Sequence, residues 1–497
     1  MSDRPKLGWS DLRGARAGVW GFGREGNANL RKLRSLGVEP VLVDDSPAPG
    51  AEDVLATADG GLDALLRCDV VVKTPGISRY RPEAGRLRAA GVVLAGGRGL
   101  WLQEADRARV VCLTGTKGKS TTSSVLGHLL TGLGYRTMVG GNIGAVPYDP
   151  GRDGGDYDYW VIEVSSYQAT DLASSPPVTA ITSLHPDHLP WHGSVERYYR
   201  DKLSACSQPG AELTVANGDS ELLRERAALL APRVEWVSES DEPGATWMAP
   251  LGLPGRHNRR NALIARRVLR ALGVSGADDD TALRAAAAGY TALPSRLTTV
   301  GVADGVRFVD DSLSTNVLPT LAALDAFPGK RIALIVGGQD RGIDYAPLAA
   351  GVYAREAPTF VLTLPDSGPR IAAAFPGGSP IVADGLAGVL NCPDLETAVR
   401  AGFDWARPDG IVLLSPAAPS FGHFRDYQVR AEAFTRAFSK CAAFPSLRPL
   451  FFSSPRIRAS RQGGSAPWRL ASPGARVSPS HPEYPSRVSC APTSMIP

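Results

Sequence analysis

The sequence predicts an α/β protein of three domains with largely parallel sheets, followed by an unstructured C-terminal segment. The chain has 497 residues, and a domain usually holds ~100–200 residues. Short apolar runs that read as buried strands alternate with helical stretches from about residue 16 to about residue 440. Such alternation is typical of βαβ units, whose crossover connections make neighbouring strands parallel.

The first domain is expected over residues 1–107. Residues 17–20 read as a strand that enters a glycine-rich turn at 21–26. A helical stretch with regularly spaced leucines follows, and residues 41–43 form the next strand. This βαβ unit predicts a Rossmann-like domain.

The second domain is expected over residues 108–294 and the third over residues 295–440. The second begins with an apolar strand at 109–113 that runs directly into a loop rich in glycine and lysine. The third contains four apolar runs, which begin near residue 307 and continue with 332–336, 359–362 and 411–414. We expect a phosphate-loop nucleotide-binding domain followed by a second Rossmann-like domain.

The C-terminal segment, residues 441–497, has a different composition. It is rich in Ser, Pro and Arg and lacks sustained periodicity, so it is expected to be disordered. From residue 442 onward it contains seven arginines, no lysine and one glutamate, a net charge of +6. The preceding residues carry 47 basic and 49 acidic groups, which argues against nucleic acid as a partner of the body of the protein.

Cysteine spacing and hydropathy argue against a zinc-binding, disulfide-rich, secreted or membrane-spanning protein. The six cysteines are scattered and show no CxxC pattern, so neither a zinc site nor a disulfide framework is predicted. The N-terminus has no apolar signal-peptide core, and no run of ~18 apolar residues follows. We therefore expect a cytoplasmic protein without membrane association, and a monomer.

The strongest local motif is the loop of residues 115–121, which follows an apolar strand. Its glycines allow backbone N–H groups to face phosphate oxygens, Lys119 supplies a positive charge, and Ser120 can reach a magnesium ion. The general phosphate-loop pattern places glycine where this chain has Leu113, so the loop is a variant. We predict an ATP site with magnesium.

The glycine turn of the first domain supports two interpretations of its ligand. Gly21, Gly23 and Gly26, with Asp44 or Asp45 about 20 residues further on, satisfy the dinucleotide-binding fingerprint. Alone, the turn would indicate an NAD-dependent oxidoreductase. However, the diphosphate of any nucleotide suits this helix N-terminus equally well, and an oxidoreductase leaves the second loop unexplained.

The variant phosphate loop resembles that of the Mur ligase superfamily, whose members activate a carboxylate as an acyl phosphate that an amine then attacks. Six further segments resemble family motifs and stand in the family's order, so the resemblance covers roughly residues 15–440. They are residues 141–144, 163–168, 185–202, 253–262, 311–316 and 414–427. The segment Glu163-Val-Ser-Ser-Tyr-Gln168 resembles the MurD branch in particular, which joins glutamate to UDP-N-acetylmuramoyl-L-alanine (UDP-MurNAc-L-Ala).

The resemblance implies a role for each matching residue. ATP would be held by Gly115, Thr116, Lys117, Gly118, Lys119, Ser120, Thr121, His257, Asn258, Asn261, Arg296 and Asp311. The UDP-linked substrate would contact Gly23, Arg24, Glu25, Asp44, Asp45, Ser46, Thr74, Asn142, Ser165 and Gln168. Glutamate would contact Thr315, Arg341, Ser420 and Tyr427.

Five residues are expected to be catalytic: Lys119, Glu163, His188, Lys202 and Arg296. Magnesium would be bound by Ser120, Glu163 and His188, together with Lys202 if that lysine is carbamylated, as the family pattern implies. Carbamylation would convert a cation into an anionic ligand. Arg296 would stabilise the charge that moves off the γ-phosphate.

Departures from the common MurD pattern bear on which glutamate is used. Most MurD sequences place lysine where this chain has Leu313, and lysine again in the glycine-rich turn that here contains Arg341. Arg24, Glu25 and Lys117 also differ from the usual residues. This set resembles a less common branch that adds L-glutamate, so we favour L-glutamate over D-glutamate. A regulatory NTP-binding protein without ligase chemistry is the more distant alternative.

Overall fold

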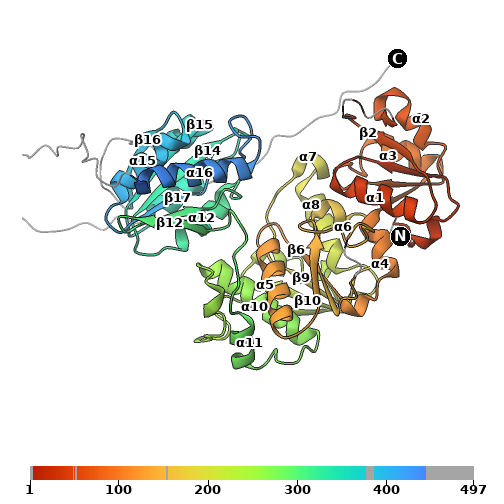
Figure 1. Cartoon of the computed structure of the whole chain (residues 1–497), viewed down its shortest axis with the longest axis horizontal. Helices are drawn as coiled ribbons and strands as arrows, with labels where there is room; N and C mark the ends of the chain where they lie inside the picture. The colour runs from red at the N-terminus through yellow and green to blue at the C-terminus, as the bar shows by residue number, and fades with distance from the viewer. Residues whose placement is uncertain (1–3, 49, 51–52, 153–154, 376–384, 444–497) are drawn as a thin grey trace, which may run out of the picture. The chain divides into compact units, whose positions relative to one another are not determined.

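The computed structural model describes residues 4–48, 50, 53–152, 155–375 and 385–443. The segment predicted to be disordered lies outside them, except that residues 441–443 form the end of the last helix. The described residues contain three separate sheets, each with helices packed against it (Figure 1). The prediction of an α/β fold with several parallel sheets is confirmed.

The first sheet is parallel, with strand order β3-β2-β1-β4-β5. Its strands are β1 (Ala17–Trp20), β2 (Val41–Asp44), β3 (Val54–Ala56), β4 (Val70–Lys73) and β5 (Val93–Gly96). Its helices are α1 (Arg24–Ser35), α2 (Leu62–Leu65), α3 (Pro82–Ala89) and α4 (Gly97–Glu104). Strands β1 and β4 are buried along their whole length, as expected for central strands covered on both faces.

The second sheet is also parallel, with order β11-β10-β9-β6-β8-β7. Its strands are β6 (Val110–Thr114), β7 (Thr137–Gly141), β8 (Tyr159–Glu163), β9 (Val178–Ile181), β10 (Leu213–Asn217) and β11 (Arg233–Val237). Its helices are α5 (Lys119–Gly132), α6 (Ser166–Ala169), α7 (Leu189–His192), α8 (Val195–Leu203), α9 (Glu221–Arg224), α10 (Arg256–Ala271) and α11 (Asp280–Ala286). Helices α5 and α10 pack together over β6, where Leu113, Leu126 and Ile264 belong to one buried cluster.

The third sheet has order β12-β13-β17-β14-β15-β16. Its strands are β12 (Thr298–Ala303), β13 (Val306–Asp310), β14 (Ile332–Gly338), β15 (Thr359–Asp366), β16 (Leu386–Asn391) and β17 (Ile411–Leu414). Its helices are α12 (Val317–Asp325), α13 (Ala346–Tyr353), α14 (Gly368–Ala373), α15 (Leu395–Ala406) and α16 (Tyr427–Ala443). Separate buried clusters lie under the two helix layers.

The third sheet differs from the sequence prediction at its edge. The prediction began this set of strands near residue 307, whereas β12 precedes it and pairs antiparallel with β13. Asp304 and Gly305 join the two strands with φ angles of 45° and 77°, the positive values that a tight hairpin turn requires. The sheet is therefore mixed, with one antiparallel edge.

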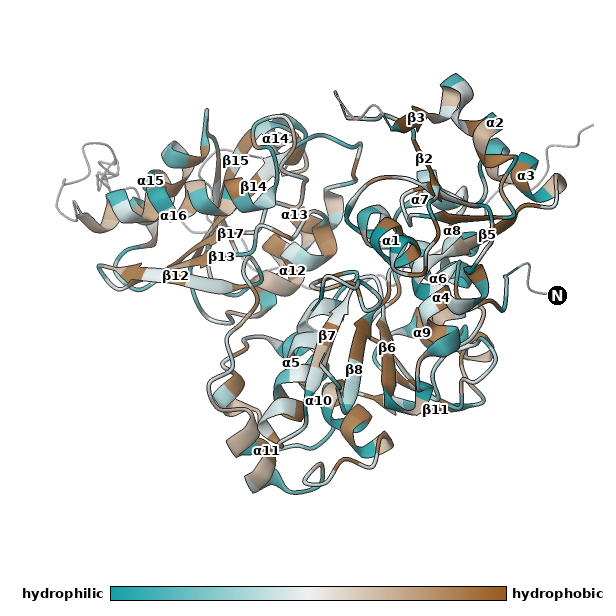
Figure 2. Cartoon of the chain, turned by 45° about the vertical axis from the view of Figure 1, so that its right-hand side comes forward, coloured by the Kyte–Doolittle hydropathy of each residue, from teal (hydrophilic) through white to brown (hydrophobic). Residues whose placement is uncertain are grey.

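Short turns of 3₁₀ or π-helix complete the backbone, at Ser10–Leu12, Thr57–Gly61, Arg107–Arg109, Ser204–Cys206, Ala227–Leu229 and Ala249–Leu251. Figure 2 shows that many strands are strongly hydrophobic, whereas helices such as α15 and α16 carry both hydrophobic and hydrophilic residues along their length. Within the described residues, no helix has both the length and the apolar character needed to cross a membrane.

Candidate active site

The predicted site residues gather where parallel strands end. Loops follow the carboxyl ends of β1, β6 and β8 and, in the third sheet, of β13, β14 and β17. In open α/β sheets this edge is the usual place for ligands. Most of the predicted residues lie on these loops or on the helices that follow them, and Asp44, Thr74 and Asn142 lie at the ends of β2, β4 and β7. Arg296 instead precedes β12, and His257, Asn258 and Asn261 lie on α10.

The phosphate loop joins β6 to α5 through two glycines with positive φ, Gly115 at 140° and Gly118 at 87°. A side chain at Gly115 would meet the Thr182 hydroxyl at 2.1 Å, and one at Gly118 would meet Asn261 at 2.9 Å. Only glycine fits both positions, which leaves the N-terminus of the 14-residue helix α5 open toward an anion. Asn261, predicted to contact ATP, thus lies beside the loop.

Two lysines converge on this loop. Lys119 Nζ donates to the carbonyl oxygens of Gly115 at 2.8 Å and Thr116 at 3.2 Å, and Lys202 Nζ donates to Gly115 at 3.0 Å. Burial, followed by the charge of the other lysine, holds the pKa of Lys202 well below its ordinary value. Burial likewise lowers the pKa of Lys119. Burial therefore disfavours a positive charge on both amines in the free protein, and an arriving anion would offset this effect.

Further loop contacts are made by the segment between β9 and α7, which contains His185 and Asp187, and by Tyr198 of α8. Lys117 Nζ lies 3.6 Å from an Asp187 oxygen, and the Thr116 hydroxyl lies 2.8 Å from that of Tyr198. Ser120 and Thr121 open helix α5 and are each 9% exposed. Lys117, which differs from the usual MurD residue, thus pairs with Asp187. Ser120 stays within reach of a ligand at the loop.

Glu163 ends β8 with its carboxylate only half satisfied. Its Oε1 accepts from the Asn142 side chain at 2.8 Å, whereas Oε2 is buried and has no partner among the residues that the structure describes. The residue is 1% exposed, and its charge acts on Lys119, Lys202 and Arg296. A buried carboxylate oxygen without a donor is costly. The geometry therefore favours a cation or a donor from a ligand at Oε2.

His188 caps helix α7 with a left-handed backbone (φ 51°) and is half exposed. Its ring centroid lies 5.0 Å from that of Tyr167. Burial outweighs the neighbouring Asp187 and lowers the pKa of His188, so the imidazole is neutral near pH 7. A neutral imidazole is the form that can bind a metal.

The other residues predicted to hold ATP are on two elements. His257, Asn258 and Asn261 lie in the first turns of α10, where Asn258 is fixed by a hydrogen bond to Pro254 O at 2.8 Å. Burial lowers the pKa of His257 to about 4, so its ring is neutral at physiological pH. Arg296 is partly buried and lies between two non-glycine residues with positive φ, Ser295 and Leu297. Such strained backbone is concentrated at functional sites.

Asp311, predicted to contact ATP, is buried. It accepts hydrogen bonds from the Ser314 and Ser415 hydroxyls at 2.5 and 2.8 Å and from Leu297 N at 3.3 Å. Burial raises the pKa of Asp311 to about 7. The carboxyl group therefore joins the segment after β13, the segment after β17 and the strained backbone around Arg296.

The glycine turn of the first domain is closely packed. A side chain at Gly26 would meet the Gly21 carbonyl oxygen at 2.0 Å, and one at Gly21 would meet Thr74 at 2.0 Å. Asp44 accepts from the backbone N–H groups of Phe22 at 2.6 Å and Ser46 at 2.8 Å, so it shapes the turn. Asp45 pairs with Arg81 at 2.7 Å, which lowers the pKa of Asp45 against the effect of its burial. Gly23 is exposed at the start of α1.

Four residues predicted to bind the nucleotide substrate make contacts within the protein. Arg24 donates to backbone carbonyls of the 141–144 loop. Glu25 accepts from Gln168 Nε2 at 2.5 Å and from the buried Arg98 at 3.3 Å. Ser165 and Gln168 form a capping box that starts helix α6. Arg24 and the Glu25–Gln168 pair therefore link the first domain to the second.

The four residues predicted to bind glutamate lie on neighbouring loops of the third sheet. Thr315 follows β13, Arg341 follows β14, Ser420 follows β17, and Tyr427 opens α16. The parallel pairing of β13 and β14 with β17 brings these loops to one edge. Arg341 is exposed and bonds only Gln339, at 3.2 Å, among the contacts of the described residues, so its guanidinium can receive a carboxylate.

Sequence reasoning missed two buried groups. His192 is fully buried, with Nδ1 2.7 Å from Asp201 Oδ2 and Nε2 3.0 Å from the Ser166 hydroxyl. Arg430 is 1% exposed and donates to the carbonyl oxygens of Ser312 and Ala418, which lie in two of the predicted glutamate loops. No short motif marks either residue, because their partners lie on other helices and loops.

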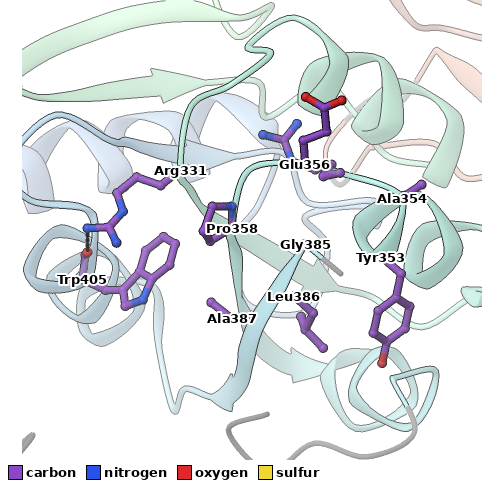
Figure 3. A pocket seen from close by; sticks show the side chains of 10 residues that line it. Arg331, Tyr353, Ala354, Glu356, Pro358, Gly385, Leu386, Ala387 and Trp405 are labelled. Carbon is purple, nitrogen blue, oxygen red and sulfur yellow. Dashed lines mark hydrogen bonds between the residues drawn. The ribbon is translucent and has the colours of Figure 1, made fainter. Parts of the chain in front are cut away.

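The third domain also has a cavity of about 670 Å³ (Figure 3). It is lined by Arg331, Pro358 and Leu386, which lie at the amino ends of β14, β15 and β16. Arg331 is occupied by carbonyl oxygens of Trp405 and Arg407 and by the Trp405 ring. The cavity is therefore at the edge of the sheet opposite the predicted glutamate loops.

A phosphate loop with the partly buried Lys119 and the buried Lys202 beside a half-satisfied carboxylate can hold ATP and polarise its γ-phosphate. With a separate glycine turn for a nucleotide and an exposed arginine on the third domain, these features define an ATP-dependent amide ligase. Residues 113–269 match the model of the Mur ligase middle domain, and residues 295–418 match that of the Mur ligase glutamate ligase domain. The chain belongs to the Mur ligase family.

Relatives with functional names extend over most of the chain. A protein of a Micromonospora species named UDP-N-acetylmuramoyl-L-alanine--L-glutamate ligase is 40% identical over 461 residues, which is 88% of this chain and 99% of the relative. A Xanthomonas euvesicatoria protein of the same name is 39% identical, over 86% of this chain and 96% of the relative. Among solved structures, MurF ligase from Thermotoga maritima in complex with ADP has a TM-score of 0.51 and 17% identity, over 88% of this chain and 98% of that one, and supports the fold.

Proposed function

We propose that the protein joins L-glutamate to UDP-MurNAc-L-Ala and converts ATP to ADP and phosphate in the same reaction. The observation that carries this proposal is the convergence of Lys119 and Lys202 beside the half-satisfied carboxylate of Glu163. The named relatives support the choice of nucleotide substrate and amino acid.

The stereochemical preference rests on two further observations. The relatives that match most of the chain carry L-glutamate in their names. Leu313 stands where most MurD sequences carry lysine, so the segment after β13 offers no cation at that position to a glutamate carboxylate. Arg341 supplies the planar, bidentate group that a carboxylate fits. D-glutamate remains the competing substrate for the test.

The chemistry follows from these positions. The alanine carboxylate attacks the γ-phosphorus, ADP leaves, and an acyl phosphate forms. The amine of glutamate attacks the carbonyl carbon, loses a proton, and expels phosphate through a tetrahedral intermediate. Lys119 neutralises charge on the transferring group, and Arg296 lies where charge leaving the γ-phosphate is stabilised. The reaction thus depends mainly on positioning and electrostatics.

The donor set fits magnesium. Ser120 and Glu163 offer the hard oxygens that this ion prefers, and the buried Oε2 of Glu163 has no partner in the described residues. His188 and a carbamylated Lys202 would complete the set, and the lowered pKa of Lys202 favours the neutral amine that reacts with carbon dioxide. When bound, magnesium would neutralise phosphate charge.

We also propose the domain limits 1–107, 108–294 and 295–440, a cytoplasmic location and a monomeric state. Between the first and second sheets the limit falls in the turn Arg107–Arg109, and between the second and third it falls before the strained residues around Arg296. A cytoplasmic location fits an enzyme that needs ATP. Domain closure would bring the amine on the third domain to the acyl phosphate.

Phosphate release by the purified full-length chain tests the proposal. With MgATP and UDP-MurNAc-L-Ala, L-glutamate should stimulate release at least about tenfold more than D-glutamate, because the wrong enantiomer misplaces the amine. Faster release with D-glutamate would contradict the stereochemical choice. ATP binding without glutamate-dependent release would indicate a regulatory NTP-binding protein, and NAD(H) binding at the glycine turn would indicate an oxidoreductase.

A further inference from the structure

Arg24 and the 141–144 loop form a contact that the predicted substrate role does not explain. Arg24 is the first residue of α1, directly after the glycine turn. Its guanidinium donates to Gly144 O at 2.8 Å, Gly141 O at 2.9 Å and Asn142 O at 3.0 Å. One side chain of the first domain therefore gathers three carbonyl oxygens of the central domain.

The loop is shaped to present these carbonyls. Gly141 and Gly144 have φ angles of 107° and 58°, and Gly141 N donates to Ala145 O at 2.9 Å, which closes the loop on itself. Carbonyl oxygens that point inward from such a turn attract a cation. A cation at a helix N-terminus is disfavoured by the helix dipole, so the three acceptors offset an unfavourable position for Arg24.

The loop in turn fixes Glu163. Asn142 makes two hydrogen bonds to that residue, from its side chain to Oε1 at 2.8 Å and from its backbone N–H to the Glu163 carbonyl oxygen at 2.9 Å. With Oε1 occupied, the carboxylate plane is set and Oε2 is left for a ligand. A chain of direct contacts thus runs from Arg24 through Asn142 to the half-satisfied carboxylate.

We infer that Arg24 is a positioning residue that anchors the 141–144 loop, so that Asn142 holds Glu163 in the orientation needed for MgATP. This inference rests on the proposed function for the role of Glu163. It assigns Arg24 a different task from the one its place beside the glycine turn suggests, which is contact with the nucleotide diphosphate. The neighbouring Glu25 strengthens the same junction through Gln168 at 2.5 Å.

Helix α1 offers a matched control. Arg31 also lies on this helix and also reaches the central domain, where it pairs with Asp149 at 2.5 Å. That contact does not involve the 141–144 loop. Replacing Arg31 therefore removes a similar cation and a similar link between the domains without loosening Asn142. Arg24→Lys adds a second comparison, because a single ammonium cannot span three carbonyls as a planar guanidinium does.

Hydrogen exchange on the ligand-free protein tests the anchoring step. Arg24→Ala should speed exchange of the amides of residues 141–145 at least about tenfold, because loss of the anchor allows local opening. Arg31→Ala should leave that segment unchanged, and Arg24→Lys should fall between. Unchanged exchange in Arg24→Ala would overturn the inference. This measurement needs no substrate, so it remains decisive even if the proposed ligase activity is absent.

Kinetics test the positioning step. Arg24→Ala should lower kcat by about 10-fold to 100-fold, the usual effect of losing a group that orients a ligand residue, and raise the Mg²⁺ concentration for half-maximal rate. The KM for UDP-MurNAc-L-Ala should stay within about twofold. The double variant with Asn142→Ala should be no worse than Asn142→Ala alone, because both act on Glu163.

The opposite kinetic pattern has a clear meaning. A raised KM for UDP-MurNAc-L-Ala with unchanged kcat and unchanged Mg²⁺ dependence would make Arg24 a direct contact of the nucleotide, and would overturn the inference. Titration of a non-hydrolysable ATP analogue at several Mg²⁺ concentrations gives an independent readout. There Arg24→Ala should weaken the Mg²⁺-dependent part of binding and Arg31→Ala should not.

Discussion

Lys119 and Lys202 share one acceptor, the carbonyl oxygen of Gly115, at 2.8 and 3.0 Å. The two lysines come from the phosphate-loop helix α5 and from α8. Burial lowers the pKa of both lysines, and the charge of Lys119 lowers the pKa of Lys202 further. Two lysines that share one carbonyl acceptor lose little hydrogen-bond energy when they turn toward a triphosphate or another anion. The ligand-free site therefore favours the binding of an anion.

Lys119 should be indispensable for turnover. Lys119→Ala removes the charge at the end of the phosphate loop and should lower kcat at least about 100-fold, because positioned charge supplies most of phosphoryl-transfer catalysis. Lys117→Ala is the control, since Lys117 pairs with Asp187 at 3.6 Å. Lys117→Ala should lower kcat much less than Lys119→Ala does. Steady-state phosphate release measures both variants, and turnover retained by Lys119→Ala would remove the phosphate-loop role.

Lys202 should reduce the stability of the free protein. Its pKa is lowered by burial and by Lys119, so the folded state binds this proton more weakly than the unfolded state does. The free-energy cost to folding grows as pH falls below ~10.4, the ordinary pKa of a lysine side chain. Lys202→Met should therefore raise the free energy of unfolding by about 1–4 kcal/mol at neutral pH, and by less at pH 9, while it abolishes activity.

The control for that experiment is Lys440→Met, at an exposed ion pair with Glu396. Such pairs contribute about 0–1 kcal/mol, so this variant should change stability little at either pH. Urea unfolding of the unliganded proteins gives both values. A Lys202→Met protein less stable than the wild type at pH 7 would show that the lysine is held by a favourable charge instead.

Asp311 should make stability depend on pH between about 4 and 7. Burial raises its folded-state pKa to about 7, above the unfolded value of ~3.9. The folded state thus keeps a proton that the unfolded state releases, and this contribution is present at low pH and lost as pH rises to 7. Relative to the wild type, Asp311→Asn should gain on the order of a few kcal/mol of stability across that window.

Exposed Asp409 on the same domain provides the comparison for Asp311. Asp409→Asn should follow the wild-type curve of unfolding free energy against pH. Denaturant unfolding at pH 5 and pH 8 suffices to measure the difference. If Asp311→Asn tracked the wild type at both values, the buried carboxyl group would have to ionise as an ordinary aspartate.

His192 should be structural and should influence Lys202 indirectly. The imidazole joins Asp201, the neighbour of Lys202 on α8, to Ser166 at the start of α6. His192→Ala removes a partner from Ser166 and from Asp201, although Asp201 keeps its hydrogen bond from the Tyr80 hydroxyl at 2.6 Å. The variant should therefore lower the free energy of unfolding by about 1–3 kcal/mol and also reduce kcat. His423→Ala, at a half-exposed histidine, should have little effect on either. Wild-type stability in His192→Ala would refute the bridging role.

The sequence predicted much of the fold because parallel βαβ units leave a periodic signal. The glycines of the two turns predicted to bind nucleotides could also be identified from the sequence. The structure explains why glycine is needed there, since Gly26 and Gly115 have no room for a side chain. The hairpin of β12 was missed although Asp304-Gly305 is a typical hairpin signal, because the preceding strand is only partly buried and not strongly apolar.

The candidate site residues could be chosen from the sequence, but the partners that they contact could not be predicted. Arg24 and Glu25 were expected beside the nucleotide, and the structure pairs them with Gly141 and Gln168, more than a hundred residues away along the chain. Contacts of that separation depend on how domains pack, which local patterns do not encode. The same reason hides Arg430, whose buried guanidinium bonds the carbonyl of Ser312.

The central claim is that the phosphate loop turns a substrate carboxylate into an acyl phosphate. Its most direct test uses UDP-MurNAc-L-Ala with ¹⁸O in both carboxylate oxygens, together with unlabelled ATP and glutamate. If an acyl phosphate forms, every phosphate released with product carries one ¹⁸O, because the attacking oxygen leaves with the phosphate. Phosphate free of label, formed alongside the new amide, would contradict the account.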